Sequence, residues 1–291
     1  MDEKNLARWR HLVRCFDTEA PLHVIDVGAR PLERPLYQNL LENQLCKLSG
    51  FEPDPESFKK LEQIELENAQ YYCMALGDGT ARTLNIYRSG GFTSVLSPYE
   101  PSLQYLGRFK RALRIINKVD VDLHRMDEVE GLRDGDILKI DVQGFEREII
   151  LGGKRVLQNA IMIIPEVRYL RIYQAEPMFG EIDSLLRNMG FSYLKTLFTK
   201  SMRINSRYAG RLSQKYQGSQ AIDGDVIYIK DLSAPGTFSD SQLKHLCLSA
   251  DAVVQSYDLA LKCLELLTSR GCVSEEDVST YIDLIPENES A

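Results

Sequence analysis

Long hydrophobic runs are absent from this chain of 291 residues. No apolar segment reaches the roughly 18–20 residues that a membrane-spanning helix needs. Residues 1–5 are largely charged or polar, and no apolar signal-peptide core follows them. We therefore expect a protein that has no membrane span and works in the cytoplasm.

Cysteine and histidine form no recognisable metal-binding pattern. The chain has six cysteines and four histidines, with no Cys-x-x-Cys pair and no histidine expected to share a zinc site with a cysteine. The thiols are expected to be reduced, as in cytosolic proteins. This pattern excludes a disulfide framework and predicts no bound metal.

An excess of positive charge is absent as well. Lys and Arg number 35 against 42 Asp and Glu, which gives a net charge of −7. A general affinity for nucleic acid needs a basic footprint, so we expect no nucleic-acid partner. The hydrophobic content of 44% is that of a globular protein with a real core.

What the chain does contain is a strand ending that recurs. In residues 138–146 (LKIDVQGFE) an apolar run ends in an acid, followed by a glycine and a second acid. Apolar runs in residues 24–29 (VIDVGA) and 48–53 (LSGFEP) also end at an acid. Open α/β sheets bind ligands at the carboxyl ends of their strands. The acids are therefore expected around one crevice.

Periodicity predicts an α/β domain with helices at both ends. The predicted strands cover residues 22–27, 47–52, 71–76, 136–141, 161–167, 191–197 and 225–229. After a break at residues 233–236 the sequence is typical of helix only. We predict an N-terminal helix (1–20), one α/β domain (21–232) and a C-terminal helical extension (237–291).

The C-terminal helices carry an apolar stripe whose partner the sequence does not name. Packing on the main sheet is the default interpretation. Pairing between subunits, which would give a homodimer, and covering the active site are the alternatives.

Two basic stretches stand out in this acidic chain. One lies at residues 108–118, and the other lies in the long polar connection between the last two predicted strands, around residues 195–215. If both hang over the sheet edge, they favour an anionic substrate, such as a sugar nucleotide, an acidic glycan or a lipid-linked sugar. Tyr193, Tyr208 and Tyr216 could stack on a sugar ring. The alternative is an ordinary solvated surface with packed tyrosines.

The first glycine loop disfavours nicotinamide and flavin. Gly28 lets the backbone turn tightly, but residues 29–32 (ARPL) contain no second glycine. A suitable Tyr-x-x-x-Lys pair is also missing, which disfavours an NAD-dependent sugar enzyme. S-adenosylmethionine, which carries no phosphate, fits this loop better.

A family resemblance follows from these motifs. It covers roughly residues 22–230, and the strings at 50–54 and 138–146 are its most specific pieces. The chain resembles the FkbM family of S-adenosylmethionine-dependent methyltransferases. The residues that carry the resemblance are Asp26-x-Gly28-Ala29, 50–54 (GFEPD), 75–78 (ALGD), Thr93-Ser94, 138–146 (LKIDVQGFE) and Glu166.

The resemblance implies a class I methyltransferase (Rossmann-like) fold. Its sheet is seven-stranded and mostly parallel, with the last strand antiparallel, and here it would have the N-terminal helix and the C-terminal helical extension added. It also implies O-methylation of a hydroxyl on a sugar, glycan or related small molecule. In the implied cofactor site, Asp26, Gly28 and Ala29 line the methionine portion, Glu52 holds the ribose, Asp78 lies by the adenine and Asp141 lies near the sulfonium.

Asp141 and Glu166 are the candidate catalytic residues. They end adjacent predicted strands, so both can face the transferring group and accept the hydroxyl proton. Glu166 follows Pro165 on a buried strand, where desolvation raises a carboxyl pKa. A salt bridge, with Arg168 or a lysine, is the alternative role for Glu166. The two carboxylates could instead bind a divalent metal, but without a third ligand the support for a metal site is weak.

One departure from the family supports a competing function. Family members carry Asn and a further Gly shortly after the Gly-Ala, whereas this chain has residues 30–35 (RPLERP). Prolines stiffen that loop and remove amide donors. The alternative is therefore a non-catalytic binding protein on a methyltransferase fold with an altered cofactor loop.

Overall fold

A seven-stranded sheet forms the centre of the molecule. The structure is a computed structural model that describes residues 3–17, 20–30, 34–64, 66–213, 215 and 217–286. The strand order is β3-β2-β1-β7-β8-β10-β9, and neighbours are parallel except that β10 is antiparallel to both β8 and β9. This confirms the expected mostly parallel sheet with an antiparallel last strand. The strands are β1 (Leu22–Val27), β2 (Cys46–Phe51), β3 (Ala69–Tyr72), β7 (Ile137–Ile140), β8 (Met162–Arg168), β9 (Phe191–Met202) and β10 (Gln220–Lys230).

A smaller sheet changes one sequence-based expectation. It has the order β4-β6-β5, with β4 (Ala75–Leu76), β6 (Ile115–His124) and β5 (Ala81–Tyr87). The single strand predicted over residues 71–76 is therefore two strands, because the chain leaves the main sheet after β3 and pairs β4 with β6. A short apolar run does not reveal its partner strand.

Alternating side chains give the main sheet two buried faces. Val24 packs in one apolar cluster, with α1, α2 and the C-terminal helices, whereas Ile25 packs in another, with α5 and α6. Ile137 and Leu138 divide in the same way. Successive residues of a strand point to opposite faces, so helices cover both sides of the sheet.

The helices are short and end at identifiable signals. None of the described helices is long and apolar enough to cross a bilayer. α5 ends at Gly152, because the glycine pair 152–153 stops it. The helices are α1 (Glu3–Phe16), α2 (Gln38–Glu42), α3 (Pro55–Glu62), α4 (Glu100–Leu106), α5 (Glu146–Gly152), α6 (Phe179–Asn188), α7 (Asp240–Ala252), α8 (Tyr257–Ser269) and α9 (Glu275–Asp283), with 3-10 turns η1 (Gly90–Phe92), η2 (Met126–Glu128), η3 (Ala209–Arg211) and η5 (Pro235–Thr237).

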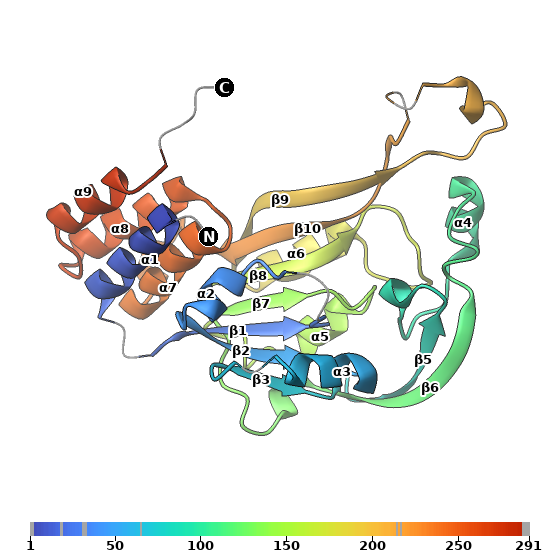
Figure 1. The fold of residues 1–291 in the computed structure, drawn as a ribbon, viewed down its shortest axis with the longest axis horizontal. Coiled ribbons are helices and arrows are strands. Elements are labelled where there is room, and N and C mark those ends of the chain that lie inside the picture. Colours follow the sequence, from blue (N-terminus) through green and yellow to red (C-terminus); the bar gives the residue numbers. More distant parts are fainter. Residues whose placement is uncertain are drawn as a thin grey trace.

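The first helix packs with the last three. Figure 1 shows α1 gathered with α7–α9 at one end of the molecule. Asp251 is fully buried and accepts hydrogen bonds from Arg8 (Nη2–Oδ1, 2.9 Å), Trp9 and Tyr281. Apolar residues of these helices share a core cluster with strands β1, β2, β7 and β10. The default interpretation, packing on the main sheet, therefore holds.

The connection predicted between the last two strands is shorter than expected, because residues 198–202 belong to β9 and residues 220–224 belong to β10. β9 and β10 run on to Met202 and Gln220, so they form a long antiparallel arm that projects beyond the sheet (Figure 1). The chain just beyond β9 meets α4, where the Asn205 amide donates to the Tyr105 carbonyl at 3.1 Å. β9 ends at Met202 and β10 begins at Gln220, so a long connection is present, with narrower bounds than predicted. The outer strand residues were missed because polar residues on both sides of an arm give no alternation.

Candidate functional site

The predicted acids lie at the carboxyl edge of the main sheet. Asp26, in β1, is paired in register with Gly50 of β2 and Lys139 of β7. Asp141 directly follows β7, and its amide donates to the Val27 carbonyl at 3.0 Å. Parallel pairing of β1 with β7 therefore sets Asp26 and Asp141 side by side in the sheet.

The backbone at Gly28 leaves no room for a side chain. Its φ is +85°, and a Cβ placed there would lie 2.1 Å from the Asp141 carbonyl oxygen. The amides of Gly28 and Ala29 both donate to the Phe51 carbonyl, at 3.0 and 3.1 Å. The tight turn predicted after β1 is thus held between β2 and the end of β7.

A cavity of about 560 Å³ opens at this edge. That volume lies in the range of about 300–1,000 Å³ typical of small-molecule sites. Among the predicted site residues, Asp26, Gly28, Ala29 and Asp141 line it. Its other lining residues are Arg30, Arg34, Pro35, Leu36, Tyr37, Gln38, Leu41, Glu42, Leu48, Leu61, Ile64, Tyr71, Lys139, Leu197, Phe198 and Asp225. Residues 31–33 of the altered loop lie outside the described part of the chain.

Asp26 is buried and only partly satisfied. The Tyr37 hydroxyl donates to its Oδ2, whereas Oδ1 has no hydrogen-bond partner among the described residues. Burial raises the pKa of Asp26, and nearby Lys139, whose Nζ lies 3.8 Å from Oδ1, opposes that shift. A buried acceptor beside a cavity suits a ligand that brings a donor.

Lys139 lies between carboxylates. Its Nζ is 3.8 Å from Asp26 and 3.9 Å from Asp141. Burial alone would lower the pKa of Lys139, but Asp26, Asp141, Asp225 and Glu166 together raise it. The ammonium therefore stays charged and keeps Asp141, whose pKa is lowered, in its carboxylate form.

Glu52 lies just after β2 and is buried. Its Oε1 accepts the Asp54 amide at 2.8 Å. Burial raises the pKa of Glu52 to about 7, which the Asp54 amide and Arg30 only partly oppose. Glu52 is close to its titration point at neutral pH, and it does not line the cavity as the structure stands.

Asp78 lies apart from the other acids. It follows β4 of the small sheet, and its carboxylate accepts from Thr80 and Arg82 (Oδ2–Nη2, 2.6 Å). The structure gives no contact between Asp78 and Asp26, Glu52 or Asp141 among the described residues, and Asp78 lines no part of the cavity. Its predicted place beside an adenine rests on position in the chain alone.

Gln143 joins the two candidate catalytic acids. Its Nε2 donates to Asp141 Oδ1 at 2.8 Å and to Glu166 Oε2 at 3.0 Å. The backbone of Gln143 has a φ of +60°, and Ser94 Oγ holds it by donating to its carbonyl at 2.7 Å. One buried amide thus spans the ends of β7 and β8.

Arg168 pairs with three acids in the interior. Its guanidinium lies 2.7 Å from Glu166, 3.3 Å from Glu176 and 2.8 Å from Asp223. It also donates to Gln143 Oε1 at 2.8 Å. The salt bridge considered for Glu166 is therefore present, and it coexists with the link to Asp141. Burial and neighbouring acids raise the pKa of Glu166 well above its ordinary value, which Arg168 opposes.

Glu146 holds the loop that carries Gln143. Its Oε1 accepts the amides of Val142, at 3.2 Å, and Gly144, at 3.0 Å. Burial raises the pKa of Glu146 to about 7. The second acid of the 138–146 string is thus a support for the turn.

Sequence reasoning missed four polar residues of this site. Tyr37, Lys139, Gln143 and Arg168 were not singled out as site residues, although Arg168 was named as a partner for Glu166. Lys139 carried a signal, because a lysine inside an otherwise apolar strand must find a counter-charge. Gln143 carried none, since a positive φ at a glutamine is not readable from composition.

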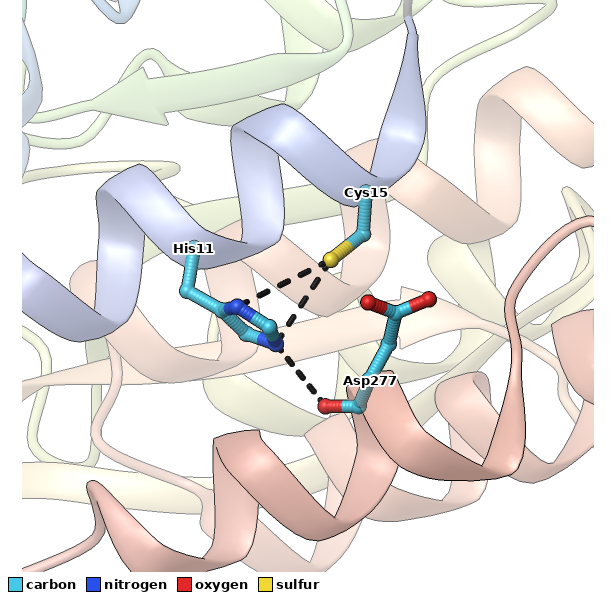
Figure 2. A group of neighbouring side chains, drawn as sticks. All are labelled: His11, Cys15 and Asp277. Carbon is cyan, nitrogen blue, oxygen red and sulfur yellow. Dashed lines mark hydrogen bonds between the residues drawn. The ribbon is translucent and has the colours of Figure 1, made fainter.

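His11 and Cys15, one helical turn apart on α1, meet Asp277 of α9 (Figure 2). The sequence pattern predicts no histidine at zinc-ligand spacing beside a cysteine, but in the fold these three residues lie close enough to hold a metal ion. His11 Nε2 is 2.8 Å from the Asp277 carbonyl, and Asp277 Oδ2 accepts from Ser274. Burial raises the pKa of Cys15 to about 11. These bonds satisfy the group internally, so it is best explained as a junction between two helices.

No curated protein matches the chain. Solved structures that match include a precorrin-6y C5,15-methyltransferase from Geobacter metallireducens GS-15 (12% identity, 77% of this chain and 87% of that chain, TM-score 0.35). The plantazolicin methyltransferase in complex with SAH also matches (12%, 79% and 86%, TM-score 0.35). Nothing about this chain follows from likenesses that weak.

The match to a protein family, in contrast, covers enough of the chain to assign it. The family described as "Methyltransferase FkbM domain" matches residues 26–193, which is more than half of the chain. These residues contain the end of β1, the glycine turn, Glu52, Asp78, the 138–146 string and Glu166. The protein therefore belongs to the FkbM family of S-adenosylmethionine-dependent methyltransferases.

Proposed function

We propose that the protein methylates a hydroxyl of a sugar, glycan or related small molecule, and that the acceptor is anionic. The observation that carries this proposal is the link from Asp141, at the cavity, through Gln143 to Glu166. A pair of joined carboxylates can take the proton that a hydroxyl must lose. Arg30, which lines the cavity, favours a negatively charged acceptor.

The cofactor residues are assigned by position and tested by fit. Gly28 and Ala29 would line the methionine portion, and Asp26 Oδ1, which accepts no hydrogen bond among the described residues, suits the donor groups at that end. Glu52 would accept two ribose hydroxyls, because a carboxylate offers two acceptor oxygens. Asp78 would lie by the adenine. Asp26, Gly28 and Ala29 line the cavity and so fit the methionine portion of S-adenosylmethionine, whereas the roles of Glu52 and Asp78 rest on their positions in the chain.

The chemistry needs positioning more than covalent help. When bound, S-adenosylmethionine supplies an electrophilic methyl group. Asp141 and Lys139 set the charge around the acceptor oxygen, since Lys139 keeps Asp141 ionised. Glu166 is the stronger base of the pair because burial raises its pKa. Gln143 holds both carboxylates in a fixed geometry, which is how a site gains from proximity.

A methyl-transfer assay tests the proposal. Purified protein is incubated with S-adenosylmethionine carrying a labelled methyl group and a panel of acidic glycans, sugar nucleotides and neutral sugars. We expect label on an oxygen of an anionic acceptor, located by mass spectrometry and NMR. Asp141→Asn and Glu166→Gln should each lower turnover about 10²–10⁴-fold, the contribution of a positioned base. Label on nitrogen only would contradict the proposal.

The non-catalytic alternative makes a different prediction. Arg34, Pro35 and Leu36, from the end of the altered loop, line the cavity. A scaffold protein would bind neither S-adenosylmethionine nor S-adenosylhomocysteine in calorimetry, with NAD as control. Under that alternative Glu52→Ala would behave as the parent protein does.

Three further assignments complete the proposal. We propose that the protein works in the cytoplasm, that residues 21–232 form the methyltransferase domain, and that two copies pair through the C-terminal helices. Ile282 of α9 is exposed and available for such pairing. Light scattering coupled to size exclusion would give twice the 33.1 kDa chain mass for a dimer.

A further inference from the structure

Two segments of this acidic protein contain no acid at all. Residues 101–119 and 195–221 carry eleven Lys and Arg and neither Asp nor Glu. The rest of the chain has 24 basic and 42 acidic residues, a net charge of −18. These segments, less than a fifth of the sequence, therefore carry a net positive charge, whereas the rest of the chain is strongly negative.

The fold joins these two segments into one lobe, which we call the basic lobe. Met202 and Ile222, at the ends of the arm strands, share an apolar cluster with Leu103, Leu106 and Leu113. The arm also bonds to the α4 segment through the Asn205 amide and the Tyr105 carbonyl. Figure 1 shows the arm and α4 at the end of the molecule opposite α7–α9.

The basic lobe also exposes large apolar side chains. Seven of the eleven large hydrophobic residues that are exposed in the described part of the chain belong to it. Ile116, Tyr208 and Leu212 are the most open, with exposed fractions of 61%, 55% and 54%. The other four are Tyr105, Val119, Phe198 and Ile204.

The basic side chains are available to a partner. Seven of them are exposed and take part in no salt bridge within the described residues. They are Arg108, Lys110, Arg111, Arg114, Lys118, Arg207 and Arg211. Exposed cations beside exposed apolar side chains are the pattern of a surface that binds at the membrane interface.

We propose that the basic lobe docks on a membrane surface that bears anionic lipids. The exposed Lys and Arg side chains of the lobe would contact anionic headgroups. Ile116, Ile204 and Leu212 would insert at the boundary between the headgroups and the acyl chains. Single-stranded nucleic acid binds by stacking its bases on aromatic rings, which explains exposed Tyr105, Phe198 and Tyr208 but gives no role to these three aliphatic residues. Leu197 and Phe198 belong to the lobe and also line the cavity. Docking therefore holds the cavity beside the lipid headgroups.

Vesicle co-sedimentation of the full chain tests this, without cofactor or acceptor present. Vesicles of 30% phosphatidylglycerol in phosphatidylcholine are compared with pure phosphatidylcholine. We expect binding to the anionic vesicles only, and weaker binding as salt rises. Because each basic residue near such a surface contributes about five-fold in affinity, Arg108→Gln/Arg111→Gln/Arg211→Gln should bind about 100-fold more weakly.

Two further variants separate lipid docking from other causes. Ile204→Ser/Leu212→Ser keeps every charge and should bind at least about five-fold more weakly, because each loses apolar burial. Arg10→Gln/Arg14→Gln removes two exposed charges from α1, at the opposite end of the molecule, and should bind as the parent does. Unchanged thermal midpoints show that the variants fold.

Several outcomes would overturn the proposal. Equal binding to neutral and anionic vesicles would remove the role of charge. Parent-like binding by the Ile204→Ser/Leu212→Ser variant would reduce the lobe to a general polyanion site. Release of the protein from vesicles by a single-stranded oligonucleotide at equal phosphate concentration would favour nucleic acid instead. Methyl transfer to soluble acceptors is unaffected by any of these results.

Discussion

Glu52 makes cofactor binding depend on pH. Burial raises the pKa of Glu52 to about 7, so a proton competes for the carboxylate in the neutral range. If the ionised form accepts the ribose hydroxyls, affinity rises with pH up to about 7 and then levels off. Below 7 the loss approaches about tenfold per pH unit. Calorimetry of S-adenosylhomocysteine binding from pH 5.5 to 8.5 measures it. Glu52→Gln should bind weakly without this slope, and a flat profile for the parent would refute the role.

Gly28 gives a second residue-scale prediction. An alanine at this position would have to adopt a φ of +85° and place its Cβ 2.1 Å from the Asp141 carbonyl. Gly28→Ala should therefore abolish cofactor binding and lower the free energy of unfolding by about 1–3 kcal/mol or more. Gly180→Ala, in α6 with open space around it, is the matched control and should be neutral or stabilising. Parent-like binding by Gly28→Ala would remove the turn from the site.

The helices at one end of the molecule depend on a single buried acid. Asp251 of α7 accepts from Arg8 and Trp9 of α1 and from Tyr281 of α9. Asp251→Ala leaves the Arg8 charge buried without its partner, which costs about 3–5 kcal/mol. Denaturant unfolding measures the change. Asp240→Ala removes an exposed pair with Arg270 and should cost no more than about 1 kcal/mol, because solvent screens it. Equal losses would mean that the buried pair is no stronger than a surface pair.

Strands could be predicted where burial leaves a pattern. β1 has the predicted bounds, and β7 and β8 lie within a residue or so of theirs, because buried parallel strands are short apolar runs between turns. The outer half of the β9–β10 arm could not be predicted, because its Lys, Ser and Thr side chains give no hydrophobic alternation with a period of two. β4 could not be separated from β3 because its partner, β6, lies some 50 residues away in sequence.

The candidate site divides in the same way. Asp26, Gly28 and Asp141 could be predicted, because acids and glycines at strand ends follow from topology. The polar network beneath them could not. Gln143 and Arg168 act through long-range contacts, such as the 2.8 Å bond from Arg168 to Asp223, that no local pattern records. Asp78 is the opposite case. Its sequence motif is present, but in the structure its carboxylate accepts a hydrogen bond from Arg82.

At the scale of the whole molecule, ligand binding should stabilise the fold. The cavity takes residues from both halves of the sheet, from Asp26 in β1 to Asp225 in β10, so unfolding must release the ligand. S-adenosylhomocysteine at 100 times its Kd should stabilise the protein by about 2.7 kcal/mol. Differential scanning fluorimetry measures the rise in Tm. NAD is the control, and a Tm that NAD raises as much as S-adenosylhomocysteine does would contradict the cofactor assignment.

The packing of α1 on α7 and α9 separates the order of synthesis from the order of assembly. Arg8 and Asp251 stand 243 positions apart, so on the ribosome the first helix must wait for almost the entire chain before its partners emerge. The main sheet can form before that moment. Trp9 is the only tryptophan in the chain, and it is buried against Asp251. Its fluorescence therefore reports when α1 packs against the C-terminal helices, which is the last step of assembly, and does not report the earlier formation of the sheet.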